Sequence, residues 1–152
     1  SGLIGESNLG RPNNLFPLIL NSFMNNTKID IFGNDWPTHD GTCIRDFIHV
    51  EDLSEAHVKA LENLESSSEY LNCFNIGTGV GTSVMDLINV FKETNNVNVH
   101  YGFTSRREGD VAILVADNSL AISTLNWEPK RTLQQMCKDG YKWIINNPKG
   151  YR

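Results

Sequence analysis

The chain has 152 residues, 39% of them hydrophobic and 20% charged, which is ordinary for a single globular domain. Its net charge of −5 gives no general attraction to nucleic acid, and no apolar run approaches the ~20 residues of a membrane-spanning helix, so neither nucleic acid nor a membrane is expected as a partner. Three cysteines without CxxC spacing and four histidines without metal-ligand spacing predict free thiols, a cytoplasmic location and no metal site.

The first half of the chain predicts two helices and two strands. Residues 12–25 place apolar side chains at helical spacing, and residues 29–32 read as a strand that ends at a glycine. A second strand is expected near 43–50. The acidic pair Glu51 and Asp52 then predicts the start of a helix that runs to about residue 65.

The second half alternates strands with helices. In chain order, strands are expected near 72–76, 97–103 and 113–115, and helices over 83–94, 117–125 and 132–146. This alternation predicts a mixed α/β domain in which helices cover a small sheet.

The stretch FNIGTGVGTSV, residues 74–84, resembles on paper a phosphate-binding turn between a strand and a helix. A dinucleotide fingerprint needs a third glycine where this chain has Thr82, so the match fails. The preferred interpretation is a tight turn with positive φ angles at its three glycines, followed by a helix that Thr82 or Ser83 caps and Asp86 supports. No cofactor is therefore expected to bind in this turn.

The most specific stretch is GNDWPTHDGTCIRDFIHVEDL at residues 33–53. Together with RPNNLFP (11–17), FNIGTGVGTSV (74–84), RREGD (106–110) and NPKGY (147–151), it resembles the UDP-glucose 4-epimerase family of extended short-chain dehydrogenase/reductases. The resemblance covers essentially the whole chain. Related dehydratases and decarboxylases usually pass more directly from the GxG turn to the RDF segment, so the WPTHDG insert favours the epimerase branch.

Members of that family carry an N-terminal Rossmann half that binds NAD and supplies a catalytic Tyr-xxx-Lys pair. This chain contains no Tyr-xxx-Lys. The resemblance therefore implies that residues 1–152 form the C-terminal, UDP-sugar-binding domain of a longer enzyme. NAD is expected in the full-length enzyme and not in this chain, and the chain is expected to have no catalytic residues and to be inactive alone.

The resemblance implies that two arginines bind the diphosphate of UDP. Arg45 in CIRDF and Arg107 in RREGD match the phosphate-binding arginines of the family, and forked, permanently charged donors suit a diphosphate. The bland alternatives are an ion pair between Arg45 and its neighbour Asp46, and a solvated surface charge for Arg107. Asp110 matches the acceptor for the ribose hydroxyls, with a turn cap as its alternative.

Five further positions match the nucleotide site of the family. Asn14 and Leu15 correspond to contacts at a helix start, although Asn14 could be a simple helix-entry residue. Asp30, Ile31 and Phe32 correspond to the segment that lines the uracil pocket. For Ile31 or Phe32 the alternative is core packing, and one of the two is expected to have only that role.

Leu114 departs from the family pattern, because a tyrosine is usual at that position in enzymes for hexoses. The choice of sugar is therefore open. His49 is expected to be structural, because it lies in a predicted buried strand and has no carboxylate partner at motif spacing.

Two other functions stay open: another UDP-sugar enzyme of the superfamily, such as a UDP-pentose epimerase or a UDP-glucuronate decarboxylase, and a free-standing UDP-sugar-binding module. Without the cofactor domain, exposed apolar surface is expected to cause self-association.

Overall fold

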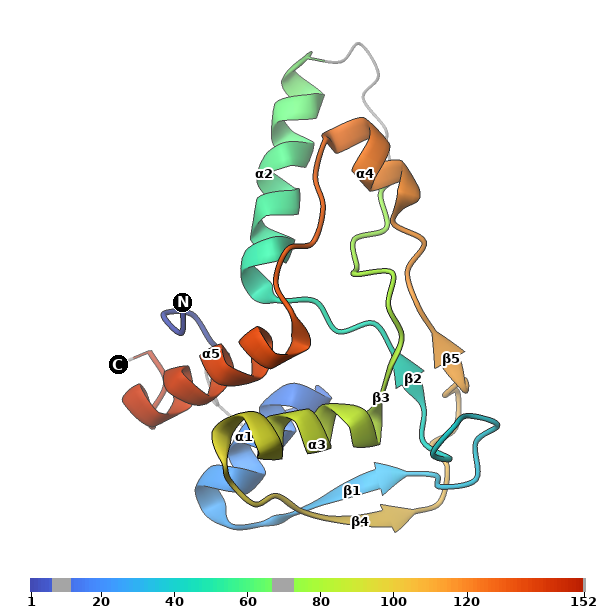
Figure 1. Cartoon of the computed structure of the whole chain (residues 1–152), viewed down its shortest axis with the longest axis vertical. Coiled ribbons are helices and arrows are strands. Elements are labelled where there is room, and N and C mark those ends of the chain that lie inside the picture. Colours follow the sequence, from blue (N-terminus) through green and yellow to red (C-terminus); the bar gives the residue numbers. More distant parts are fainter. Residues whose placement is uncertain (7–11, 67–72, 152) are drawn as a thin grey trace.

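The computed structural model describes residues 1–6, 12–66 and 73–151, and the fold is mixed α/β, as predicted (Figure 1). The helices are α1 (Leu15–Asn25), α2 (Val50–Ser66), α3 (Val84–Asn95), α4 (Ser119–Leu125) and α5 (Leu133–Asn146). The strands are β1 (Lys28–Phe32), β2 (Ile44–Arg45), β3 (Thr82–Ser83), β4 (His100–Thr104) and β5 (Ile113–Leu114).

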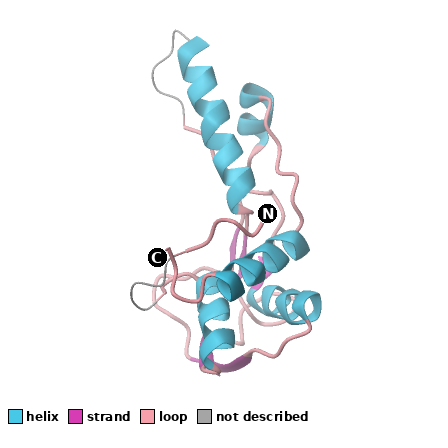
Figure 2. Ribbon diagram, turned by 90° about the vertical axis from the view of Figure 1, so that its left-hand side faces the viewer, coloured by secondary structure: helices cyan, strands magenta, loops and turns pink. Residues whose placement is uncertain are grey.

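A body and an arm make up the molecule. The body contains α1, α3 and α5 above the sheet of β1 and β4, and the arm consists of α2 and α4, which rise side by side from it (Figures 1 and 2). β1 and β4 are parallel, with Lys28 opposite His100 and Phe32 opposite Thr104. Apolar side chains of the three helices and of β1 fill the space between them, so the core lies on one face of this sheet.

The second sheet joins body and arm. β2 pairs in antiparallel fashion with β3 and in parallel with β5. Beside it, Ala56 of α2 packs with Ala121 and Leu125 of α4 and with Trp127 in a small separate cluster. The Trp127 indole Nε1–H also donates to the carbonyl of Asp52, 3.1 Å away, so α4 and the segment after it are held against α2.

Two predicted strands differ from the structure. The strand expected near 43–50 is reduced to β2, and the chain already turns into α2 at Val50. Residues 73–76 belong to no strand, while Asn72 of the same prediction lies outside the described residues. A strand needs a neighbour to satisfy its backbone groups, and within the described ranges nothing forms a ladder with 73–76.

Helix starts follow their capping residues. α1 begins at Leu15 and not at residue 12, with Asn14 at the N-cap. For α3 the prediction of Ser83 as cap is confirmed: its Oγ accepts from the Asp86 N–H at 2.9 Å, and the Asp86 carboxylate accepts from the Ser83 N–H at 3.4 Å. This reciprocal pair is a capping box.

All three cysteines are free thiols, as predicted; Cys43 and Cys137 are buried and Cys73 is exposed. Burial raises the pKa of Cys137 to about 12, so this thiol is unreactive at neutral pH. Among the described residues, no helix combines the length and the apolar character that crossing a bilayer requires. The cytoplasmic location stays a prediction.

Candidate functional site

A cavity of about 800 Å³ opens between α1, β1, β2 and the loop that precedes β5. This is within the usual range for a pocket that binds a nucleotide-sized ligand. Eight of the nine positions predicted to contact UDP-sugar line it: Asn14, Leu15, Asp30, Ile31, Phe32, Arg45, Arg107 and Asp110. Leu114 does not; it lies on β5 and is 62% exposed.

Two guanidinium groups converge on one carboxylate at this cavity. Asp110 Oδ1 accepts from Arg107 Nη2 at 2.9 Å and from Arg45 Nη2 at 3.4 Å. The alternative of an Arg45 ion pair with Asp46 is wrong, because the carboxylate beside Arg45 is that of Asp110, 65 positions further along the chain. Two cations share one anion here, so the cluster keeps a net positive charge and can attract a second anion.

The two arginines differ in how firmly they are held. Arg45 Nη1 donates to the carbonyls of Ile44 and Val111, both at 2.8 Å, and its side chain is 24% exposed. The Arg107 side chain is 60% exposed and lies in a turn that its own carbonyl closes with the Asp110 N–H, at 3.2 Å. Hydrogen bonding to Asp110 raises the pKa of Arg107, so the guanidinium stays charged. Arg45 is the preorganised member of the pair.

The glycine turn encloses a carboxylate of the protein itself. Asp46 accepts from the Thr78 N–H at 2.8 Å, the Thr78 hydroxyl at 2.6 Å, the Gly79 N–H at 2.9 Å and the Ala116 N–H at 3.3 Å. Amides that would surround a phosphate in a cofactor site are thus already occupied. Of the three glycines in the turn, only Gly79 has a positive φ, which corrects the prediction for all three.

The strand β1 presents alternate faces to the core and to the outside. Ile31 is 3% exposed and belongs to the core, whereas Phe32 is 41% exposed. The Phe32 ring lies 5.5 Å from the Arg107 guanidinium carbon. At the start of α1, the Asn14 side chain makes no capping hydrogen bond. Its amide is therefore not committed to the helix end.

His49 is not in the predicted strand, and it has a carboxylate partner that no motif spacing indicated. It is buried just before α2, and its Nε2 lies 3.2 Å from Asp139 Oδ2 on α5. The Glu51 N–H donates to its Nδ1 at 3.0 Å, so in the neutral ring the proton is on Nε2 and points to Asp139.

Three side chains of metal-ligand type also meet outside the cavity. One ligand atom each of His39, Asp40 and Asp86 lies within 4.8 Å of the others, which the sequence spacing did not indicate. Both carboxylates already accept hydrogen bonds around Ser83, and Asp40 also accepts from the Thr42 N–H at 2.8 Å. We assign this trio a structural role at the start of α3.

The sequence of this chain is similar to a known family and to curated proteins. The family described as GDP-mannose 4,6 dehydratase matches residues 14–140. A UDP-glucose 4-epimerase of Haemophilus influenzae (strain ATCC 51907 / DSM 11121 / KW20 / Rd) is 45% identical over 153 residues, covering 100% of this chain and 45% of that protein. The chain thus spans about half the length of the curated relatives it matches.

Solved epimerase structures are similar in fold as well. One is a UDP-glucose 4-epimerase from Stenotrophomonas maltophila with bound NAD and formylated UDP-arabinopyranose, at a TM-score of 0.90 and 41% identity, covering 97% of this chain and 44% of that one. Another, from Bifidobacterium longum in complex with NAD+ and UDP, gives a TM-score of 0.91 at 34% identity, covering 99% and 44%.

Proposed function

Because the chain belongs to the GDP-mannose 4,6 dehydratase family, among the extended short-chain dehydrogenase/reductases, we propose that residues 1–152 form the C-terminal, UDP-sugar-binding domain of an NAD-dependent UDP-glucose 4-epimerase. One observation carries the proposal: Arg45 and Arg107, from separate segments, converge on Asp110 at the cavity. That arrangement suits a diphosphate, whose oxygens accept from forked donors.

Each group at the cavity has a role in holding UDP. The diphosphate takes the free donors of Arg45 and Arg107, and Asp110 accepts from the ribose hydroxyls. Asp30 and Phe32 share the exposed face of β1, where Phe32 covers the uracil ring. Asn14 and Leu15 bound the nucleotide at the start of α1. In this way the chain binds the UDP part of the substrate and orients it.

The redox step belongs to the rest of the enzyme. NAD, when bound there, accepts a hydride from C4 of the sugar and returns it to the opposite face. This chain holds UDP firmly and leaves the sugar free to turn over, which is a division of binding energy between the two parts of the substrate. Alone, the chain is inactive.

The sugar is the least constrained part of the substrate. Leu114 lies outside the cavity lining, and one structural relative holds a formylated UDP-arabinopyranose. A UDP-pentose epimerase is therefore the second candidate, ahead of a UDP-glucuronate decarboxylase or a free-standing binding module. Joining this chain to the cofactor half of the Haemophilus influenzae relative and assaying UDP-galactose against UDP-xylose separates the candidates. Epimerisation of UDP-galactose supports the proposal, and turnover of UDP-xylose alone supports the alternative.

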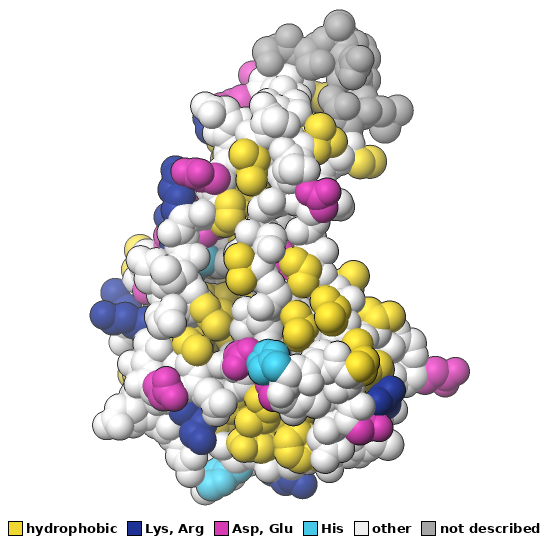
Figure 3. All heavy atoms as spheres, turned by 45° about the vertical axis from the view of Figure 1, so that its right-hand side comes forward, with side chains coloured by type: hydrophobic (Ala, Val, Ile, Leu, Met, Phe, Trp, Pro, Cys, Tyr) yellow, Lys and Arg dark blue, Asp and Glu magenta, His cyan; other side chains and the backbone are white. Residues whose placement is uncertain are grey.

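An apolar surface on the arm supports a missing partner domain. On α2, Val58, Leu61 and Leu64 are 53%, 63% and 47% exposed, and Ile122 of α4 is 42% exposed. Hydrophobic side chains are spread along the arm in the space-filling view (Figure 3). Contiguous exposed apolar surface marks an interaction site.

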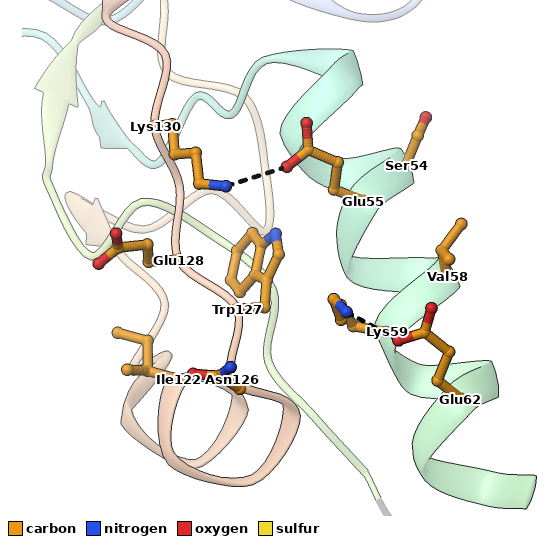
Figure 4. Close-up of a pocket in the computed structure, with 10 residues that line it drawn as sticks. All are labelled: Ser54, Glu55, Val58, Lys59, Glu62, Ile122, Asn126, Trp127, Glu128 and Lys130. Carbon is orange, nitrogen blue, oxygen red and sulfur yellow. Dashed lines mark hydrogen bonds and ion pairs between the residues drawn. The ribbon is translucent and has the colours of Figure 1, made fainter.

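The arm also contains a groove of about 640 Å³ between α2 and α4. Trp127 lies at its centre, with Val58 on one wall and Ile122 on the other (Figure 4). Phe74 and Ile76, which pack against the same cluster as Trp127, lie in a segment without a ladder partner in the described part of the chain. We propose that the cofactor half covers this surface and pairs with residues 73–76.

Without that half, the chain is expected to self-associate through the α2 surface. Light scattering across a concentration series should show dimers or larger species, because burying Leu61 and its neighbours removes apolar surface from water. The variant Leu61→Glu should shift the population toward monomer, whereas Lys138→Gln, at an exposed position on α5, should not. A wild-type chain that stays monomeric at high concentration would contradict this expectation.

A further inference from the structure

The carboxyl end of β1 is braced by an indole. Trp36 Nε1–H donates to the Phe32 carbonyl at 3.1 Å, and the Gly33 N–H donates to the Thr104 carbonyl at 2.9 Å. Gly33 has φ +84, and a Cβ there would collide with the Trp36 indole nitrogen. A glycine at this position is therefore what lets the indole lie against the turn.

Arg106 and Arg107 contact different aromatic rings at the carboxyl end of β1. The Arg106 guanidinium carbon lies 4.0 Å from the centre of the Trp36 ring, and Arg107 lies over Phe32 instead. Arg106 is fixed in turn by Asp35, whose carboxylate accepts from its Nε at 2.7 Å and whose carbonyl accepts from its Nη2 at 2.6 Å. Stacking and ion pair together immobilise the indole.

The rest of this loop is anchored independently of Trp36. The Thr38 hydroxyl donates to the Thr42 carbonyl at 2.7 Å, and Asp40 accepts from the Thr42 N–H at 2.8 Å and from the Ser83 hydroxyl. Loss of the Trp36 side chain therefore removes the hydrogen bond to the Phe32 carbonyl, while these anchors and the pairing of β1 with β4 remain.

This end of β1 faces the cavity. Asp30, Ile31 and Phe32 line it, and among the described residues β1 pairs only with β4, so one backbone edge of the strand is unpaired. A free edge can exchange hydrogen bonds with a planar base. The backbone conformation of Phe32 determines the position of the unpaired edge of β1 and also the position of the Phe32 ring.

We infer that Trp36, held in place by Arg106, is a positioning residue for recognition of the pyrimidine base. The inference rests on the proposed function, because it assumes that a uridine nucleotide occupies the cavity. Trp36 itself does not line the cavity. It acts through Phe32, and it affects the base more than the phosphates, because Arg45 is held by the carbonyls of Ile44 and Val111.

The test compares three ligands on the full 152-residue chain by calorimetry: uridine, UDP and inorganic pyrophosphate. Trp36→Ala should weaken uridine and UDP by the same factor, about 3- to 10-fold, because both the orienting hydrogen bond and the ring stacked under Arg106 are lost. Its affinity for pyrophosphate should change by less than about twofold, because Arg45 keeps its contacts with the backbone. Trp36→Phe keeps a ring under Arg106 but loses the N–H, and should give about half that loss on a logarithmic scale.

Arg45→Gln is the opposite control, because it should weaken UDP and pyrophosphate while leaving uridine within about twofold. Lys59→Gln, on the arm, should change none of the three affinities. Equal uridine binding by wild type and both Trp36 variants, or a loss confined to pyrophosphate, would overturn the inference. A wild-type chain that binds neither UDP nor pyrophosphate would instead refute the proposed function.

Discussion

Replacing Arg45 by glutamine is expected to weaken UDP binding by about 10- to 100-fold, because a charge-assisted contact of this type contributes roughly 1.5–3 kcal/mol. Arg45 is largely shielded from solvent and two backbone carbonyls at 2.8 Å already orient it, so little order has to be imposed when the diphosphate binds. Calorimetric titration of variant and wild type with UDP measures the ratio directly.

The companion variants sharpen this prediction. Arg107→Gln should cost less than Arg45→Gln, because the Arg107 side chain is 60% exposed and its interactions are screened by water. Melting curves without ligand show whether the Arg45 variant is folded, since it also loses a hydrogen bond to the Val111 carbonyl. A folded Arg45→Gln chain with wild-type affinity for UDP would remove this arginine from the site.

The second large effect concerns the joint between arm and body. Asp52→Ala is expected to lower the free energy of unfolding by about 3–5 kcal/mol, the usual range when one partner of a buried ion pair is removed. The Asp52 side chain is fully buried on α2 and accepts from the Arg131 N–H at 2.9 Å, the Lys130 N–H at 3.2 Å and the Arg131 guanidinium. These donors precede α5, so the carboxylate ties α2 to the body.

Urea denaturation followed by circular dichroism measures the loss. Glu55→Gln is the matched control, because Glu55 bonds the same Arg131 guanidinium at 3.0 Å from a side chain that is 41% exposed. That change should cost less than about 1 kcal/mol. If both substitutions lowered the free energy of unfolding equally, burial of Asp52 would not be the reason for its contribution to stability.

Local patterns in the sequence predicted the helices well. Each helix of the described residues was expected: α1 from its apolar spacing, α2 from the acidic pair Glu51 and Asp52, and α3 from Ser83 and Asp86 at its start. Strands were less predictable, because a strand depends on its neighbour: residues 73–76 read as a strand but have no ladder partner among the residues described. β2 ends at Arg45 because Asp46 turns to the glycine loop.

In the candidate site, too, the residue positions were predictable from the sequence but the contacts between distant residues were not. Residue types and motif order placed eight positions that now line one cavity. The pairs that shape the site join residues far apart in sequence: Asp46 with Thr78, 32 positions on, and His49 with Asp139, 90 positions on. No spacing rule covers such distances, so only the folded chain reveals them. The hydrogen bond from Trp36 to the Phe32 carbonyl joins residues that are close in sequence. The Arg106 side chain that stacks on the Trp36 ring comes from another loop.

Titration of the 152-residue chain with UDP by calorimetry tests the central claim most directly. We predict saturable binding at a single site, weaker for uridine, which lacks the diphosphate, and weaker for ADP, whose purine lacks the imide group through which uracil would bond to the edge of β1. The absence of any binding heat with UDP at millimolar concentration, or equal affinities for UDP and ADP, would contradict the account.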